Sequence, residues 1–153
     1  MKNKLLVLPI ILIIVSVACM SATPPPPITV EQDAEFTLAP DQTATVTNTG
    51  LTIRLIGVAG DERCPSGMEC AMSGPVSISL SVQQNNASAV NVDLQTFTDG
   101  NGRAPSGEFE GIKDRMAVGG YLIRVMAVTP YPTAKSKSIK SSEYRVALTV
   151  SKQ

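Results

Sequence analysis

Four sulfur-bearing side chains lie close together near the middle of the chain. Cys64, Met68, Cys70 and Met72 form the pattern Cys-x₃-Met-x-Cys-x-Met. Thiolate and thioether sulfurs are soft ligands that select Cu(I), so this spacing could build a surface copper site. A disulfide between the cysteines, with both methionines packed beneath it, accounts for the same residues, because methionine fills irregular apolar space. We favour the structural disulfide and keep the Cu(I) site as the alternative.

A third cysteine follows an N-terminal segment that is typical of export. Lys2 and Lys4 precede an apolar run from Leu5 to Val15, and Ser16-Val17-Ala18 leads into Cys19. A positively charged start, an apolar centre and small residues at the cleavage site are typical of a signal peptide. The segment Ser16-Val17-Ala18-Cys19 resembles a bacterial lipobox, which implies that Cys19 is lipidated and begins the mature chain. The alternatives are ordinary cleavage without lipid and an uncleaved anchor helix.

The predicted signal peptide and lipidated cysteine define the expected organisation of the chain. Residues 1–18 are the lipoprotein signal peptide, 19–27 are the lipidated cysteine with a proline-rich tether, and 28–153 are one β-sandwich domain. The run Pro24 to Pro27 predicts a stiff polyproline II spacer with no packing of its own. We expect an exported protein, anchored through the lipid on Cys19 to the bacterial cell envelope, at the outer membrane or the cell surface. Outside the cytoplasm, Cys64 and Cys70 should oxidise.

Hydrophobic periodicity indicates the elements that position these residues. From Glu35 onward the period is two rather than 3.6, most clearly where Val76, Ile78, Leu80 and Val82 alternate with polar residues. Glycine, proline, asparagine and aspartate separate the alternating segments, as turns require. The expected strands cover 35–38, 42–46, 51–58, 76–83, 90–95, 114–118, 121–128 and 144–151. We therefore expect an all-β fold, an antiparallel immunoglobulin-like β-sandwich of about seven or eight strands.

Composition narrows the classes of function. The 153-residue chain contains no histidine and no tryptophan, and its 13 basic side chains balance its 13 acidic ones. Without histidine, Ser-His-Asp and Cys-His catalysis and His-ligated metal sites are excluded. The balanced charge provides no basic field for nucleic acid. We therefore expect a protein that is not an enzyme, requires no cofactor and binds no nucleic acid.

Three charged segments outside the cysteine region are better explained as ordinary surface. Asp99-Gly100-Asn101-Gly102 begins like a calcium loop, but Arg103 and Ala104 stand where a further oxygen ligand and the turn glycine are needed. Glu108 and Glu110 are two carboxylates with nothing nearby that would raise a pKa. The basic loop of Lys135, Lys137 and Lys140 is expected to be solvated.

The segment around the two cysteines carries a family resemblance. Asp61-Glu62-Arg63-Cys64-Pro65, followed by Cys70-Ala71-Met72-Ser73-Gly74, resembles the signature of a group of uncharacterised bacterial secreted proteins and lipoproteins. Their pattern reads Asp-Ser-Arg-Cys-Pro, then Cys, an apolar residue, Trp, Ala and Gly. Glu62 replaces the usual serine and Met72 the usual tryptophan. The resemblance extends to Phe36-x-Leu38, to Tyr121 with the Pro130 to Pro132 run, and to the closing segment Tyr144 to Leu148. It implies a secreted β domain and supplies no reaction.

Together these features predict a non-catalytic, lipid-anchored β-sandwich of the cell envelope that serves binding or structural support. The candidate binding loop comprises Arg63, Pro65, Met68 and Glu69, and its expected partner is an unknown envelope protein. A disulfide-stiffened loop suits insertion into another protein's cleft, so a protease-inhibitor-like module is one alternative. A Cu(I)-handling envelope protein is the other.

Overall fold

The computed structural model describes residues 23–136 and 138–153, which form two β-sheets and no α-helix. The predicted signal peptide, Cys19 and the first residues of the predicted tether lie outside the described residues, so the predictions made for them stay predictions. No helix in residues 23–136 or 138–153 is long and apolar enough to cross a membrane. The nine strands of this part are β1 (Ile28–Val30), β2 (Phe36–Leu38), β3 (Thr43–Val46), β4 (Leu51–Asp61), β5 (Val76–Gln84), β6 (Val90–Thr96), β7 (Arg115–Val118), β8 (Tyr121–Thr129) and β9 (Arg145–Lys152).

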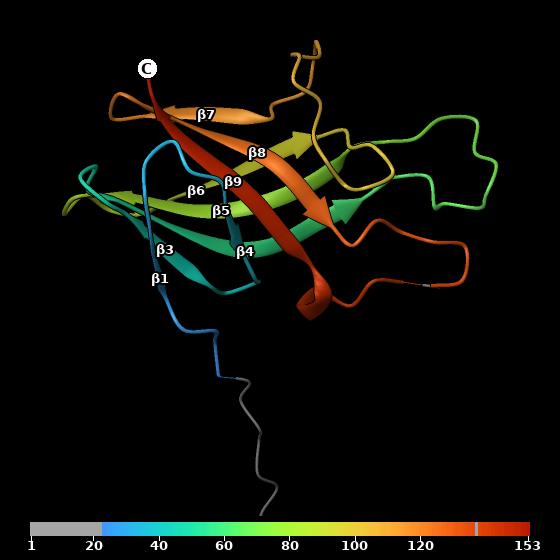
Figure 1. Ribbon diagram of the computed structural model, residues 1–153, viewed down its shortest axis with the longest axis horizontal. Helices are drawn as coiled ribbons and strands as arrows, with labels where there is room; N and C mark the ends of the chain where they lie inside the picture. Colours follow the sequence, from blue (N-terminus) through green and yellow to red (C-terminus); the bar gives the residue numbers. More distant parts are fainter. Residues whose placement is uncertain (1–22, 137) are drawn as a thin grey trace, which may run out of the picture.

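The strands form one five-stranded and one four-stranded sheet (Figure 1). The first has the order β1-β3-β4-β5-β6 and the second the order β2-β9-β8-β7. Every pairing is antiparallel except that between β1 and β3, where Ile28 lies opposite Ala44 and Val30 opposite Val46. A short 3₁₀ turn, η1 (Ser141–Glu143), precedes β9.

The core lies between the two sheets and is built by the alternating residues of the strands. In β5, Val76, Ile78, Leu80 and Val82 are buried while the serines between them are partly exposed. Residues of both sheets belong to one buried cluster, including Leu55 of β4 and Leu148 of β9. Side chains of a strand point alternately to its two faces, so this pattern places one face of each sheet in a shared interior. The predicted all-β sandwich is therefore confirmed at the level of two packed sheets.

The topology differs from the prediction in two respects. The chain forms nine strands in its described part rather than seven or eight, because Ile28–Val30 adds a parallel edge strand beside β3. From β2 to β9 the strands follow one another in chain order around the two sheets, and β9 then pairs with β2. An immunoglobulin constant domain instead combines its strands A, B, E and D in one sheet and C, F and G in the other. This strand order is therefore not the expected immunoglobulin order.

The connections differ sharply in length at the two ends of the sandwich. At one end, which we call the long-loop end, lie the connections 62–75, 97–114 and 130–144 (Figure 1). The other end has the short turns 47–50, 85–89 and 119–120, where Gln84 Nε2 at the end of β5 donates a hydrogen bond to the carbonyl oxygen of Gly119. Binding residues of β-sandwiches commonly lie on loops that a rigid scaffold positions. The long-loop end therefore contains the candidate site.

Part of the proline-rich segment contacts the domain. Gln42 Nε2 donates a hydrogen bond of 3.0 Å to the carbonyl oxygen of Pro26, and Pro25 is half-buried. The polyproline conformation leaves backbone carbonyls free for such bonds, and the strand that follows continues along β3. Pro25 and Pro26 therefore contact the folded domain, while Thr23, Pro24 and Pro27 are exposed.

Candidate functional site

The two central cysteines form a disulfide in the connection between β4 and β5. Cys64 and Cys70 are joined with their Cα atoms 6.0 Å apart, which confirms the predicted pairing. The connection continues the hairpin at its base, where the amide of Glu62 donates to the carbonyl oxygen of Pro75 and the amide of Gly74 donates to that of Glu62. The disulfide closes the ring from Cys64 to Cys70, and residues 66–73, which include the outer part of this ring, are exposed.

Arg63, next to the disulfide, is buried and not exposed on the loop. Its side chain has no exposed surface, and its guanidinium forms a two-pronged ion pair with Asp61 through Nε to Oδ1 at 2.7 Å and Nη2 to Oδ2 at 2.6 Å. Nη1 donates to the carbonyl oxygen of Val128 at 2.7 Å, and Nη2 to that of Pro130 at 3.0 Å. A longer bond of 3.4 Å runs from Nη1 to Thr98 Oγ1. These partners belong to all three connections of the long-loop end or to the strands that lead into them.

The geometry of Arg63 removes it from the predicted binding surface. A guanidinium has five N–H donors, and five hydrogen bonds to protein acceptors use all of them. A side chain that is fully buried and fully paired has no donor left for a partner. Arg63 lies at the base of the candidate binding loop, directly after β4: Glu62 before it is exposed and Cys64 after it is half-buried, but its own side chain turns inward to pair with Asp61, the last residue of β4.

Burial and charge act on the ionisable groups of this cluster in opposite directions. Burial opposes ionisation of Asp61, but the hydrogen bonds and charge of Arg63, with a bond from Tyr144, hold the pKa of its carboxyl below the usual 3.8. The Tyr144 hydroxyl donates to Asp61 Oδ2 at 3.0 Å. Burial first, and then the negative charge and hydrogen bond of Asp61, raise the pKa of Tyr144 to about 12. The cluster therefore holds a stable ion pair and a neutral phenol at neutral pH.

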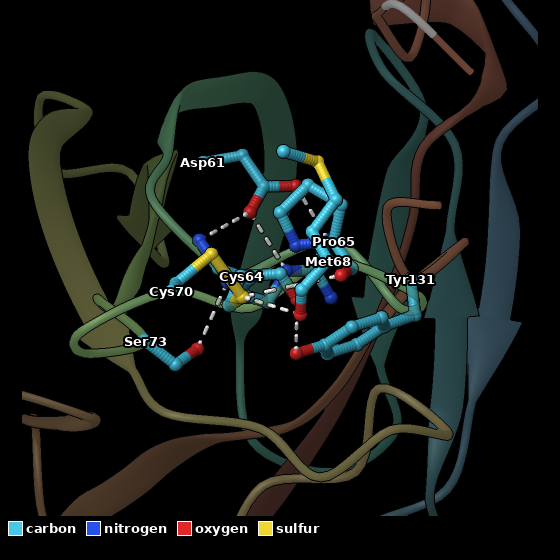
Figure 2. Close-up of a disulfide and its surroundings, with 8 residues drawn as sticks. Asp61, Cys64, Pro65, Met68, Cys70, Ser73 and Tyr131 are labelled. Atoms are coloured by element: carbon cyan, nitrogen blue, oxygen red, sulfur yellow. Dashed lines mark hydrogen bonds and ion pairs between the residues drawn. A yellow bond between two sulfur atoms is a disulfide. The ribbon is translucent and has the colours of Figure 1, made fainter. Parts of the chain in front are cut away.

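Tyr131 connects the disulfide loop to the neighbouring connection 130–144 (Figure 2). Its ring lies over the Arg63 guanidinium, 5.1 Å from the ring centroid, and its hydroxyl donates to the carbonyl oxygen of Cys64 at 2.9 Å. Further along, the amide of Ser66 donates to the carbonyl oxygen of Pro132, and Ser66 pairs as an isolated bridge with Thr133. On the opposite side, Ser73 Oγ accepts from the amide of Cys64. The loop base is thus held on both flanks.

The two methionines lie on the surface rather than beneath the disulfide. Met68 is 55% exposed and Met72 is 85% exposed, so the predicted packing of both side chains under the loop is wrong. Arg63 and Tyr131 lie at the base of the loop, and this leaves the methionines at its outer part. Glu69 is also exposed, whereas Pro65 is half-buried and its carbonyl oxygen accepts from the amide of Met68 in a turn.

The four sulfur residues do not form a metal site in this state. Cys64 and Cys70 are bonded to one another, so neither offers the thiolate that Cu(I) prefers. Among residues 23–136 and 138–153, no group of three or more Cys, Asp or Glu side chains is arranged to hold a metal ion. In the turn at Asp99, the carboxylate oxygen Oδ1 accepts from the amides of Asn101 and Arg103, which is a self-contained turn.

Of the two glutamates singled out in the sequence, Glu108 forms an ion pair and Glu110 is exposed. Glu108 pairs with Arg115, whose guanidinium also contacts Asp114. Burial opposes ionisation of Asp114, but Arg115 and Arg124 lower the pKa of its carboxyl overall. These arginines anchor the connection 97–114 to β7 and β8, and Arg124 also donates to the carbonyl oxygens of Pro105 and Ser106.

Sequence reasoning missed the partners of Arg63. Tyr131 and Thr98 lie far from it in the chain, as does Tyr144, which binds its partner Asp61, and only the folded topology brings them together. Asp61 could have been recognised, because it lies only two residues from Arg63 in the sequence and carries the opposite charge. No protein-family model matches the chain, and neither a curated protein nor a solved structure matches it.

Proposed function

We propose that this protein is an exported lipoprotein, anchored through Cys19 to the bacterial cell envelope, that presents its long-loop end to another envelope protein without catalysing a reaction. The observation that carries the proposal is the contrast within the disulfide loop. Its base is fixed by the five hydrogen bonds of Arg63, while Met68, Glu69 and Met72 are exposed. A loop that is ordered before binding loses little entropy on binding, which favours affinity.

The exposed side chains match those of contact surfaces. Methionine is flexible and polarisable, and it is frequent where a surface must adapt to a partner. Glu62 and Glu69 are the exposed charged residues of the connection 62–75, since Arg63 is buried against Asp61. The loop therefore suits a partner that offers an apolar recess with basic residues around it.

The perturbed carboxyl groups support a non-catalytic role. A general acid needs a carboxyl pKa raised toward neutrality. The pKa values of Asp61 and Asp114 are lowered instead, each by adjacent arginines, so both remain ionised. These groups hold loops in place, which agrees with the exclusion of histidine-based catalysis from the sequence.

Two other functions remain as alternatives. A protease-inhibitor-like module would use the same rigid loop, inserted into the cleft of a protease. Immunoglobulin-like modules also have their binding loops at one end of a sandwich. We retain this likeness to the long-loop end, although the strand order differs. A Cu(I)-handling protein would require reduction of Cys64 and Cys70, after which the exposed Met68 and Met72 become accessible ligands.

Position-specific crosslinking in cells tests the proposed binding surface. A photo-crosslinking amino acid at Met72, 85% exposed on the disulfide loop, should yield a discrete adduct with one protein. The matched control is the same group at Asn86, which is exposed in the short turn 85–89 at the opposite end. Equal adducts at both positions, or none at Met72, would refute presentation by the long-loop end.

Thiol titration with a Cu(I) competition assay tests the copper alternative, which requires two free thiols and tight binding of Cu(I).

The anchor is tested separately. Cys19→Ser should abolish metabolic acyl labelling and release the protein from membranes, because at least two acyl chains are needed for stable anchoring. Full membrane retention of the Cys19→Ser variant would show that the N-terminal segment is an uncleaved anchor and that the lipoprotein proposal is wrong.

A further inference from the structure

A groove of about 560 Å³ lies between the proline-rich segment, β4 and η1. Its apolar wall includes Pro24, Pro25, Pro40 and Ile56, and the Ile56 side chain is 40% exposed. Its polar side is formed by the serines of η1, by Arg145 and by Asp41, whose charge is paired with Arg54. The groove thus combines apolar side chains with the cationic side chain of Arg145, and its volume lies within the range of about 300–1,000 Å³ that is usual for ligand sites.

The cation Arg145 on the polar side has no carboxylate partner among the described residues. Arg145 is exposed, and its Nη1 donates to the carbonyl oxygens of Ser142 and Tyr144, which fix the direction of the side chain. The nearby acids are already engaged. Asp41 pairs with Arg54, and Glu143 Oε2 accepts from the amide of Lys140. The guanidinium therefore keeps its charge available for an anion, and a phosphate matches its planar donors.

The position of the tether restricts what can face this groove. Thr23 lines the groove, and only four peptide steps separate it from Cys19. Four residues span at most about 14 Å even when fully extended. If Cys19 carries acyl chains, the membrane surface must therefore lie within this distance of Thr23.

We propose that the groove rests on the bilayer, with Arg145 bound to a phospholipid phosphate and Ile56 and the prolines facing the glycerol and upper acyl region. This inference rests on the proposed lipidation of Cys19. It adds a second, weaker membrane contact that fixes how the domain is oriented at the surface. Anionic headgroups attract basic side chains that lie close to the membrane surface, as Arg145 would.

A bilayer fits the groove better than an extended peptide would. Beyond Leu55, β4 pairs only with β5 in the described structure, so its other edge is open there. The β4–β5 pairing shifts register between Leu55 and Gly57 and again between Val58 and Gly60. Bulges interrupt the regular spacing of backbone donors and acceptors that an added strand needs.

Tryptophan fluorescence in vesicles tests this orientation, because the chain contains no tryptophan of its own. Acylated Ser142→Trp and Asn86→Trp proteins, which begin at Cys19, are reconstituted in phosphatidylglycerol vesicles that contain lipids brominated on their acyl chains. Ser142 is an exposed residue of the groove, whereas Asn86 is exposed beyond the far end of β5. We expect quenching of Ser142→Trp to exceed that of Asn86→Trp by at least about twofold, because an indole beside the bilayer enters its interface.

Arg145→Gln in the Ser142→Trp background tests the phosphate contact. Arg145 is exposed and has no ion pair among the described residues, so this change should leave the melting temperature unaltered and reduce the quenching. Equal quenching at residues 142 and 86, or quenching unaffected by Arg145→Gln, would overturn the inference for a protein whose mass shows the acyl chains. A mass without acyl chains would refute the lipoprotein proposal itself, and the orientation with it.

Discussion

Replacing Arg63 by methionine should be among the most damaging single substitutions in this domain. Arg63→Met keeps an unbranched apolar stem but removes five hydrogen bonds and the positive charge beside Asp61. Removal of one member of a buried ion pair costs about 3–5 kcal/mol, because the other charge stays buried without compensation. Small domains are stable by only about 5–15 kcal/mol. The variant should therefore unfold at markedly lower urea concentration and lower temperature.

A double substitution separates two causes of the loss of stability, the uncompensated charge of Asp61 and the lost packing of Arg63. In Asp61→Asn/Arg63→Met the uncompensated carboxylate is gone, and the amide oxygen of asparagine can still accept from Tyr144. The double variant should therefore be more stable than Arg63→Met alone, although less stable than the wild type. Arg63→Lys provides a further comparison. Lysine keeps the charge but has three donors and no planar fork, so it should recover only part of the stability.

The pH dependence of unfolding gives an independent check. The pKa of Asp61 is lower in the folded protein than its usual 3.8, so this pair stabilises the fold above that pH and ceases to do so as the pH falls through the folded pKa. In Arg63→Met the carboxyl is buried without a cation, so its pKa should rise and the deficit relative to wild type should shrink toward pH 4. Urea unfolding followed by far-UV circular dichroism at pH 7 and pH 4 measures both effects. A cost below about 1 kcal/mol at pH 7, or a double variant less stable than the single one, would refute this reasoning.

Three further predictions concern the disulfide, the core and Tyr144. Reduction of Cys64–Cys70 should lower the free energy of unfolding by about 2 kcal/mol without unfolding the sandwich, because the closed loop is short; loss of the native circular dichroism spectrum on reduction would contradict this. Ile78→Asp should cost more than about 3 kcal/mol in urea titrations, since Ile78 is 1% exposed. Tyr144 should ionise with a pKa of about 12 in an ultraviolet absorbance titration. Asp61→Asn should lower that pKa, because the carboxylate charge helps to raise it, and an unchanged pKa would argue against the contact.

The main strands could be predicted because a half-buried strand leaves its alternation in the sequence. The period-two pattern of Val76–Gln83 matches the buried and exposed faces of β5. Ile28–Val30 could not be recognised in the same way. Three residues are too few to establish a period, and this edge strand depends on the parallel pairing with β3 that the folded chain supplies. The strand order was similarly inaccessible, since alternation defines faces but not neighbours.

The candidate site was only partly predictable, for a related reason. The disulfide follows from two cysteines in an exported chain, but the orientation of the side chains around it depends on distant residues. Arg63 turns inward because acceptors at Val128 and Pro130 come within hydrogen-bonding distance, more than sixty residues later in the chain. With Arg63 and Tyr131 at the base of the loop, Met68 and Met72 lie at the surface, although their residue type alone suggested packing beneath the disulfide.

Arg63 and the disulfide stabilise different parts of the loop. Arg63 connects the start of the loop to β8 and to the connections 97–114 and 130–144, outside the ring that the disulfide closes. The disulfide restricts only Cys64 to Cys70, and therefore the backbone around Met68 and Glu69. Reduction should free this outer part while Arg63 keeps the base in place. If the loop binds a partner, reduction should weaken binding through the entropy of ordering the tip, and Arg63→Lys should weaken it by displacing the whole loop.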